Sequence, residues 1–311
     1  MTGGNTFRDL LRTSAAETGS IACMGLDPIL EGLPSPELSI SSRVLFFFKL
    51  IFERMLHEKV LPGAFKPNIG FFHSLDDPME GRYEGSRSLR EIVILIRELF
   101  PGIPVILDMK RGDIARSSAN YAAEAFKVWK ADAVTVSPYM GSDSVGPFIE
   151  LASGMGRGVY ILNRTSNPGG QELQNLSMAD GQPLYKHVAK QIISWGVDAS
   201  AGTAGAVVGA TNPQELFELA RLYKEGNGTE DPAEKNIAPL LIPGVGGQGG
   251  SASQTVGILK SAGYPLELAR VNSSSGLTHP WVKKGSPLPE DFAVQVVKNL
   301  KKMNQELNYA E

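Results

Sequence analysis

The chain has 311 residues, with a hydrophobic fraction of 42% and a charged fraction of 20%, which are the proportions of an ordinary globular protein. Its formal net charge of −3 provides no basic field, so we expect neither nucleic acid nor an anionic membrane surface as a partner. The single cysteine, Cys23, excludes an intramolecular disulfide, and its apolar neighbours favour a buried thiol in a reducing compartment.

The N-terminal segment, MTGGNTFRDLLRTSAAETGS, lacks the apolar stretch of a signal peptide. The longest apolar run, VLFFFKLIF, is interrupted by Lys49 and is too short to span a bilayer. We therefore expect a cytoplasmic protein with no membrane segment.

Eight short apolar runs, rich in β-branched residues and bounded by Gly, Pro and Asp, predict strands that are buried on both faces of a parallel sheet. In chain order they cover residues 21–26, 64–69, 103–110, 132–137, 158–163, 204–210, 238–244 and 268–274.

Helical patterns alternate with these runs, and several begin at Ser or Asn-Pro residues that are typical of helix starts. One precedes the first strand and one follows the last. In chain order they cover residues 6–19, 41–59, 85–100, 117–130, 144–153, 183–197, 212–225, 251–263 and 290–307.

Eight strand–helix alternations without a linker or a shift in composition predict an α/β protein with one (β/α)₈ TIM-barrel domain over residues 1–311. A doubly wound sheet is the alternative, but it has no obvious place for eight evenly repeated units.

Chemistry in such barrels takes place at the carboxyl ends of the strands, and polar residues gather there in this sequence. Asp108, Lys110 and Asp113 follow the third predicted strand, and Lys66 lies at the end of the second. Two ammonium groups and two carboxylates sum to zero charge, so such a network tolerates partial desolvation. A lysine flanked by carboxylates stays charged, which makes it a poor Schiff-base nucleophile but a good proton donor to a carbanion.

Two other segments belong to the same rim. The connection over residues 164–182 is long and follows a strand, so we expect it to close over a ligand. The run PGVGGQGG contains a literal GxGxxG at residues 244–249, but a dinucleotide site normally follows the first strand of a doubly wound domain, and here the run follows the seventh of eight. A phosphate grip is the better interpretation. The four histidines are not paired at metal-ligand spacing and are expected at the surface or in packing.

The sequence resembles the orotidine 5′-phosphate decarboxylases, and in particular their longer, type 2 bacterial form. The core of the resemblance is the D-x-K-R-G-D-I run at residues 108–114, and further matches extend in order over nearly the whole chain. They are GLDP at 25–28, FKPNIGFF at 65–72, SPYMG at 137–141, RTSNPGG at 164–170, PLYKHVA at 183–189 and PGVGGQGG at 243–250.

This resemblance implies decarboxylation of orotidine 5′-phosphate to UMP and CO₂, the last step of de novo pyrimidine biosynthesis, without a metal or another cofactor. It implies that Lys110 protonates C6 while Asp108 lies beside the substrate carboxylate. It also implies a homodimer with shared active sites, in which Asp113, Ile114 and Ser117 reach into the neighbouring subunit's pocket.

The resemblance implies further substrate contacts. Asp27 and Lys66 would hold the ribose hydroxyls, Ser137 would contact the pyrimidine, and Gln248 with nearby backbone, including Gly249, would hold the phosphate. The family usually has an arginine after the eighth strand that pairs with the phosphate, whereas this chain has Ser275 there. Serine and backbone N–H groups bind phosphate without a bidentate cation.

Two other functions stay open at this stage. One is a metal-dependent aldol-type or decarboxylating enzyme that acts on a sugar phosphate within the same superfamily. The other is a non-catalytic nucleotide-binding paralogue, which only the missing arginine suggests.

Overall fold

The computed structural model describes residues 6–200, 202–226, 236–246 and 249–309. Eight strands form one parallel sheet in the order β2-β1-β8-β7-β6-β5-β4-β3, as the eight apolar runs predicted. The bounds are β1 (Ala22–Leu26), β2 (Ala64–Pro67), β3 (Ile106–Arg111), β4 (Ala133–Val136), β5 (Gly158–Arg164), β6 (Ala204–Val208), β7 (Leu240–Ile242) and β8 (Ala269–Ser273).

The two ends of this sheet, β2 and β3, meet and nearly close it into a barrel. Two isolated parallel bridges, Phe65 to Val105 and Asn68 to Asp108, join them, and the amide of Phe65 donates to the carbonyl of Pro104 at 2.9 Å. The fold is therefore a (β/α)₈ barrel, and the seam lies beside the two strands that carry the candidate lysines.

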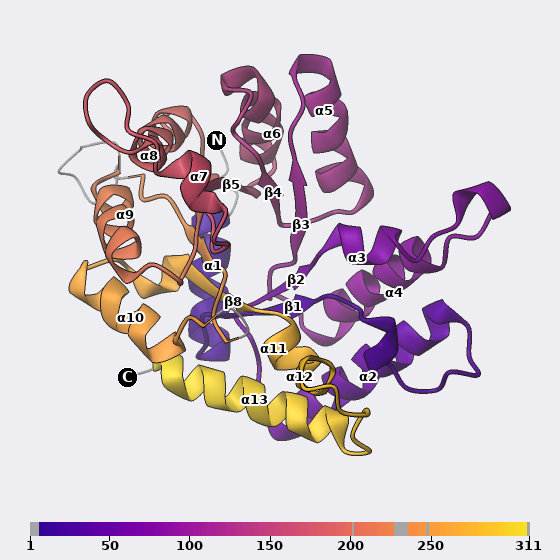
Figure 1. Cartoon of the computed structure of the whole chain (residues 1–311). Helices are drawn as coiled ribbons and strands as arrows, with labels where there is room; N and C mark the ends of the chain where they lie inside the picture. Colours follow the sequence, from indigo (N-terminus) through magenta and orange to yellow (C-terminus); the bar gives the residue numbers. More distant parts are fainter. Residues whose placement is uncertain (1–5, 201, 227–235, 247–248, 310–311) are drawn as a thin grey trace.

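Helices surround the sheet (Figure 1). The longer ones are α1 (Phe7–Thr18), α2 (Ile40–Glu58), α4 (Glu84–Leu99), α5 (Ala115–Ala123), α6 (Ser142–Gly154), α8 (Leu184–Trp195), α9 (Pro213–Glu225), α10 (Ala252–Ser261) and α13 (Phe292–Leu307). The short ones, which the sequence patterns did not predict, are α3 (Ile69–His73), α7 (Gly170–Gln174), α11 (Ser275–Thr278) and α12 (Pro280–Lys283).

Local sequence explains how the helices begin and which face they bury. Thr6 and Asp9 form a capping box at the start of α1. Ser39 caps α2 by accepting a hydrogen bond from the amide of Ser42. The buried residues of α2 recur at helical spacing and pack onto the barrel: Ser41, Val44, Phe47, Phe48, Ile51, Phe52 and Met55.

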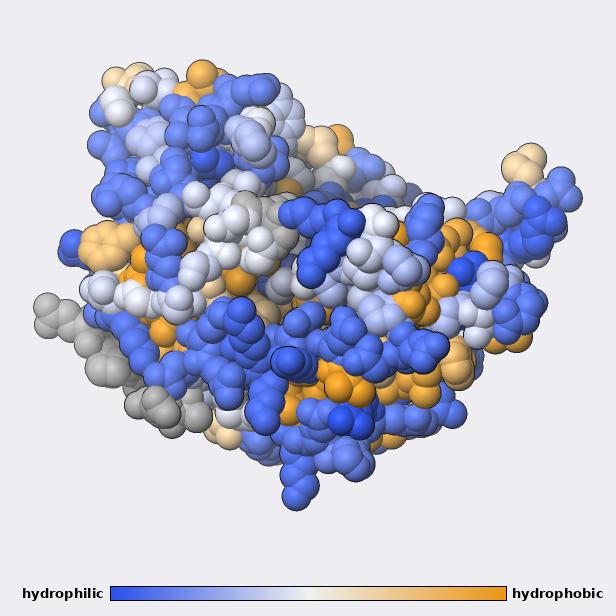
Figure 2. All heavy atoms as spheres, turned by 60° about the horizontal axis from the view of Figure 1, so that its bottom comes forward, coloured by the Kyte–Doolittle hydropathy of each residue, from blue (hydrophilic) through white to orange (hydrophobic). Residues whose placement is uncertain are grey.

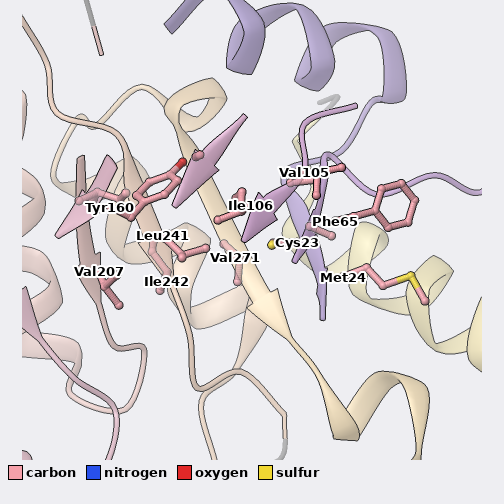
Figure 3. Close-up of a cluster of buried hydrophobic side chains, with 14 of the residues drawn as sticks. Cys23, Met24, Phe65, Val105, Ile106, Tyr160, Val207, Leu241, Ile242 and Val271 are labelled. Carbon is pink, nitrogen blue, oxygen red and sulfur yellow. The ribbon is translucent and has the colours of Figure 1, made fainter. Parts of the chain in front are cut away.

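The core lies inside the barrel and between the strands and the helices. Every residue of β1, β2, β4, β6, β7 and β8 is buried, which is why these runs are mainly apolar and do not alternate with polar residues. Figure 3 shows part of this cluster, with side chains contributed by most strands of the barrel. The labelled residues are Cys23, Met24, Phe65, Val105, Ile106, Tyr160, Val207, Leu241, Ile242 and Val271.

The outer face around α2 and α13 is mainly hydrophilic, with small separate hydrophobic areas (Figure 2). Within the described ranges, no helix combines the length and apolarity needed to cross a bilayer.

Candidate active site

Lys66, Asp108 and Lys110 meet at the carboxyl ends of β2 and β3. The Lys66 Nζ donates to Asp108 Oδ2 at 2.6 Å, and the Lys110 Nζ donates to Asp108 Oδ1 at 2.6 Å. One carboxylate thus holds two ammonium groups, one on each oxygen, as charge-assisted hydrogen bonds.

Because Lys66 and Asp108 are both buried, each depends on its charged neighbours to stay ionised. Lys66 is 4% exposed and Asp108 is 7% exposed. Burial opposes ionisation of Asp108, but the ammonium groups of Lys66 and Lys110 outweigh it and hold the pKa of this carboxyl well below its usual range. Burial likewise disfavours the charged form of Lys66, but Asp108 and Asp27 outweigh it and raise the pKa of this ammonium. Both groups are therefore ionised at neutral pH.

Lys110 differs from Lys66, because half of its side chain, 51%, stays accessible to solvent. Its backbone lies in the left-handed region, with φ of 45°, which a lysine adopts at a cost. It lies where the pairing of β3 with β4 shifts register, between Leu107 and Arg111. An irregularity of this kind redirects a side chain at the rim of a barrel, and here the ammonium points back to Asp108 while remaining open to a ligand.

Asp27 directly follows β1 and is 7% exposed. Burial raises the pKa of its carboxyl, which Lys66 and a hydrogen bond from Ser274 partly offset. Ser274 packs closely against Gly25 of β1. A side chain at residue 25 would place its Cβ only 2.0 Å from the Ser274 Oγ. Gly25 of the GLDP motif is therefore needed for this close approach.

Two buried acceptors at this point, Asp27 Oδ1 and Asn272 Oδ1, have no hydrogen-bond partner among the described residues. Such acceptors are costly to leave unpaired, and they suit a ligand with hydroxyl donors.

The glycine-rich segment after β7 turns sharply, with positive φ at Gly244, Gly246 and Gly249. The amides of Gly246 and Gly250 donate within the loop, to the carbonyls of Gly250 and Gly244 at 2.9 and 3.0 Å. The amide of Gly249 donates to Gly246 at 3.1 Å. Gln248 lies outside the described residues.

Ser275 begins the four-residue helix α11, and it is half-buried. The nearby Arg270 does not reach this rim. It is completely buried and donates to backbone carbonyls that include those of Gly63, at 2.9 Å, and Leu11, at 2.6 Å. Arg270 therefore closes the amino-terminal end of the barrel instead of facing the glycine loop.

Asp113, Ile114 and Ser117 lie beyond the charge network, in the loop and first turn that lead into α5. Asp113 accepts a hydrogen bond from the amide of Ile114 at 2.8 Å and, among the described residues, forms no ion pair. Ile114 is 50% exposed. The structure thus brings together three of the four charged residues that the sequence grouped and leaves Asp113 apart.

Ser137, which follows β4, lines a cavity of about 520 Å³. Asn163, Thr165 and Gln174 line it as well. Gln174 of α7 accepts from the amide of Thr165 at 3.0 Å and donates to its Oγ1 at 2.9 Å, so the 164–182 connection is fastened back to the end of β5.

Thr135 is the residue at this site that sequence reasoning missed. Its Oγ1 donates to Asp108 Oδ1 at 2.8 Å and accepts from the amides of Met109 and Lys110, both at 3.0 Å. The available signal was its position two residues before Ser137, on the same face of a predicted strand.

In the described part of the chain, no group of three or more His, Cys, Asp or Glu side chains is placed to hold a metal ion. Of the histidines, His279 is packed in the interior, where it stacks on Phe47 with ring centroids 4.8 Å apart.

Comparisons with known proteins point to one family. The model of the orotidine 5′-phosphate decarboxylase / HUMPS family matches residues 63–258. The orotidine 5′-phosphate decarboxylase of Delftia acidovorans is 38% identical over 279 residues, which are 88% of this chain and 90% of that protein. The one from Paracidovorax citrulli is 36% identical over 297 residues, 94% of this chain and 97% of that protein.

Solved structures give the same result. Leishmania donovani OMP decarboxylase superposes with a TM-score of 0.68 at 31% identity, over 96% of this chain and 99% of that one. Leishmania donovani UMP synthase superposes with a TM-score of 0.69 at 32% identity, over 97% of this chain and 57% of that one. With its barrel, its lysine–aspartate–lysine site and these relatives, the chain belongs to the orotidine 5′-phosphate decarboxylase family.

Proposed function

We propose that Lys110 is the proton donor in the reaction of this enzyme. The enzyme is a carboxy-lyase that converts orotidine 5′-phosphate to UMP and CO₂ in pyrimidine biosynthesis. The observation that carries the proposal is the Asp108 carboxylate, which holds the ammonium groups of Lys66 and Lys110 at 2.6 Å each.

The chemistry requires a fixed positive charge. When the bond between C6 and the carboxylate breaks, its electron pair stays at C6 in the plane of the ring, where the π system cannot delocalise it. Lys110 Nζ then gives a proton to C6, and CO₂ leaves as a neutral molecule. An ammonium group that is already positioned stabilises the developing charge without reorganisation, and removal of one such donor costs about 10²–10³-fold in rate.

Asp108 has two roles in this proposal. Its depressed pKa keeps it ionised, so it holds Lys110 in place and presents negative charge beside the substrate carboxylate. Binding energy from the rest of the nucleotide keeps the ring in this environment.

The remaining substrate contacts are also proposals. Asp27 and Lys66 bind the ribose hydroxyls, which is supported by the buried Asp27 oxygen that has no partner among the described residues. Ser137 contacts the pyrimidine. The phosphate binds at the other side of the barrel mouth, to Gln248, Gly249 and Ser275.

We also propose a cytoplasmic homodimer of single-domain subunits, in which Asp113, Ile114 and Ser117 complete the partner's site. Support comes from the exposed Ile114 and from the position of Asp113 outside its own subunit's charge network.

The direct test is the change in ultraviolet absorbance when EDTA-treated enzyme is mixed with orotidine 5′-phosphate. Wild-type protein should produce UMP, and Lys110→Ala should lose at least about 10²-fold in kcat. Lys301→Ala, which removes an exposed lysine of α13, is the matched control and should keep wild-type kcat.

Three outcomes separate the alternatives. Full activity of Lys110→Ala would refute the assigned role. Activity that disappears with EDTA and returns with a divalent cation would favour a metal-dependent lyase. UMP binding without turnover would favour a non-catalytic paralogue.

A further inference from the structure

The pairing between β3 and β4 is interrupted beside the catalytic lysine. Leu107 pairs with Val134, and the next pair is Arg111 with Val136. Three residues of β3 therefore lie opposite a single residue of β4, which is Thr135. Regular ladder hydrogen bonds are not possible across such a mismatch, and the backbone groups that it releases need other partners.

The side chain of Thr135 provides these partners. The amides of Met109 and Lys110 both donate to its Oγ1 at 3.0 Å, and the hydroxyl donates to Asp108 Oδ1 at 2.8 Å. A hydroxyl has one donor and two acceptor positions, so all three are used. Because both acceptor positions are filled by amides, the hydroxyl proton is directed to the carboxylate. Thr135 is 1% exposed, so water does not compete.

The Thr135 hydroxyl positions Lys110 in two ways, directly at its backbone amide and through Asp108 at its ammonium group. Its amide bonds directly to Thr135, and its Nζ bonds at 2.6 Å to Asp108 Oδ1, the same oxygen that receives the Thr135 proton. The backbone of Lys110 has φ of 45°, and a conformation of this kind costs about 1–3 kcal/mol and persists only where its surroundings enforce it.

We infer that Thr135 is a positioning residue for the reaction, because it fixes both the left-handed backbone of Lys110 and the carboxylate oxygen that aims the ammonium at the substrate. This inference rests on the proposed role of Lys110. Thr135 is 1% exposed and has no place in the proposed substrate contacts, so we expect its contribution in the chemical step and not in binding.

The test compares Thr135→Val, which keeps the shape and removes the hydroxyl, with Thr135→Ser, which keeps the hydroxyl. For Thr135→Val we expect kcat to fall by about 10²-fold, the effect of a misplacement of about 1 Å, while KM changes by less than about 3-fold. Thr135→Ser should restore kcat to within about 5-fold of wild type, since the three hydrogen bonds can form again.

Thr203→Val is the matched control. Thr203 is also completely buried and shares a hydrogen bond of 2.8 Å with Ser200, but it lies before β6, at the other end of the barrel. This variant should lose stability and keep kcat. If Thr135→Val does not fold, Thr135→Ala, which also removes the hydroxyl, is measured in its place with the same expectation for kcat.

A kcat of wild-type size in a folded Thr135→Val or Thr135→Ala variant would overturn the inference, and so would an equal loss of kcat in Thr135→Ser. Lys110→Ala separates this failure from failure of the proposed function. If Lys110→Ala is inactive and Thr135→Val is fully active, only the inference about Thr135 is wrong.

Discussion

The ammonium of Lys66 lies 2.6 Å from the Oδ2 of Asp108, and both side chains are almost completely buried. A buried ion pair contributes little net stability compared with an apolar pair, but removal of one partner leaves a buried charge. Asp108→Asn should therefore lower the free energy of unfolding by about 3–5 kcal/mol.

Chemical denaturation monitored by circular dichroism measures this loss. Asp198→Asn, on an exposed aspartate, should change stability by less than about 0.5 kcal/mol. Combining Asp108→Asn with Lys66→Met should recover part of the loss, because the unpaired charge is then gone. If Asp108→Asn is as stable as Asp198→Asn, the ion pair does not hold the two strands together.

The stability of the protein between pH 4 and 6.5 should depend on His279. Burial lowers the pKa of this imidazole to about 4, below its ordinary value of 6.5. The unfolded chain therefore binds a proton in this range that the folded chain does not, so stability falls as pH decreases from 6.5 to 4. This lowering of the His279 pKa corresponds to a change of about 3 kcal/mol in the free energy of unfolding.

Lys66 does not contribute to this slope, and Asp108 contributes only at its lower end, below about pH 5. The depressed pKa of Asp108 gives stability that is present above about pH 3.9 and is lost as the pH falls through the folded value. The raised pKa of Lys66 gives stability that is present below about pH 10.4 and is lost above it. Unfolding measured at several pH values should show a flatter profile for His279→Gln, whereas His57→Gln, at an exposed position, should keep the wild-type slope. Equal slopes in all three proteins would exclude His279 as the cause.

The barrel was predictable because buried parallel strands are continuous apolar runs, and all eight appeared in the predicted order. The ends of these runs were less predictable. The apolar run at 64–69 is followed closely by Phe71 and Phe72, but the strand ends at Pro67. Asn68 accepts a hydrogen bond from the amide of Gly70 and so starts α3. Such a cap competes locally with strand pairing, and composition does not show which one prevails.

The site was predictable only in part for a similar reason. Lys66, Asp108 and Lys110 are marked by charge at the ends of apolar runs. The register shift that turns Lys110 depends on the pairing of β3 with β4, which no local pattern encodes. Thr135 looks like an ordinary β-branched strand residue, so its role becomes visible only when both strands are placed.

Ser275→Arg should strengthen binding of the substrate phosphate. The resemblance of the sequence implies an arginine at this position, where the chain has a serine, and Arg270 is directed to the opposite end of the barrel. A bidentate, charge-assisted pair contributes about 1.5–3 kcal/mol, so KM for orotidine 5′-phosphate should fall by about 10-fold or more while kcat stays the same.

Steady-state kinetics and inhibition by UMP both report this change. Ser261→Arg adds the same charge at the exposed carboxyl end of α10 and should leave KM unchanged. An unchanged KM in Ser275→Arg would place the phosphate away from α11.

Two inactive variants should restore activity to each other if the active sites are shared between subunits. In the proposed dimer, each site takes Lys110 from one subunit and Asp113 from the other. Lys110→Ala and Asp113→Ala should each be nearly inactive as homodimers. In a mixed dimer, one site carries both substitutions, and the other site carries neither.

Random exchange of subunits makes half of the dimers mixed, so about a quarter of the wild-type number of sites should become active. The measurement is turnover after the two variants are mixed under conditions that dissociate and reassociate subunits. Mixing Lys110→Ala with Asp108→Ala is the control, because both residues belong to the same subunit's network and every site in the mixture then lacks one of them. Recovery with Asp113→Ala but not with Asp108→Ala would assign Asp113 to the neighbouring subunit's site. If neither mixture recovers, although subunit exchange is verified by mass spectrometry, Asp113 acts within its own subunit or outside the site.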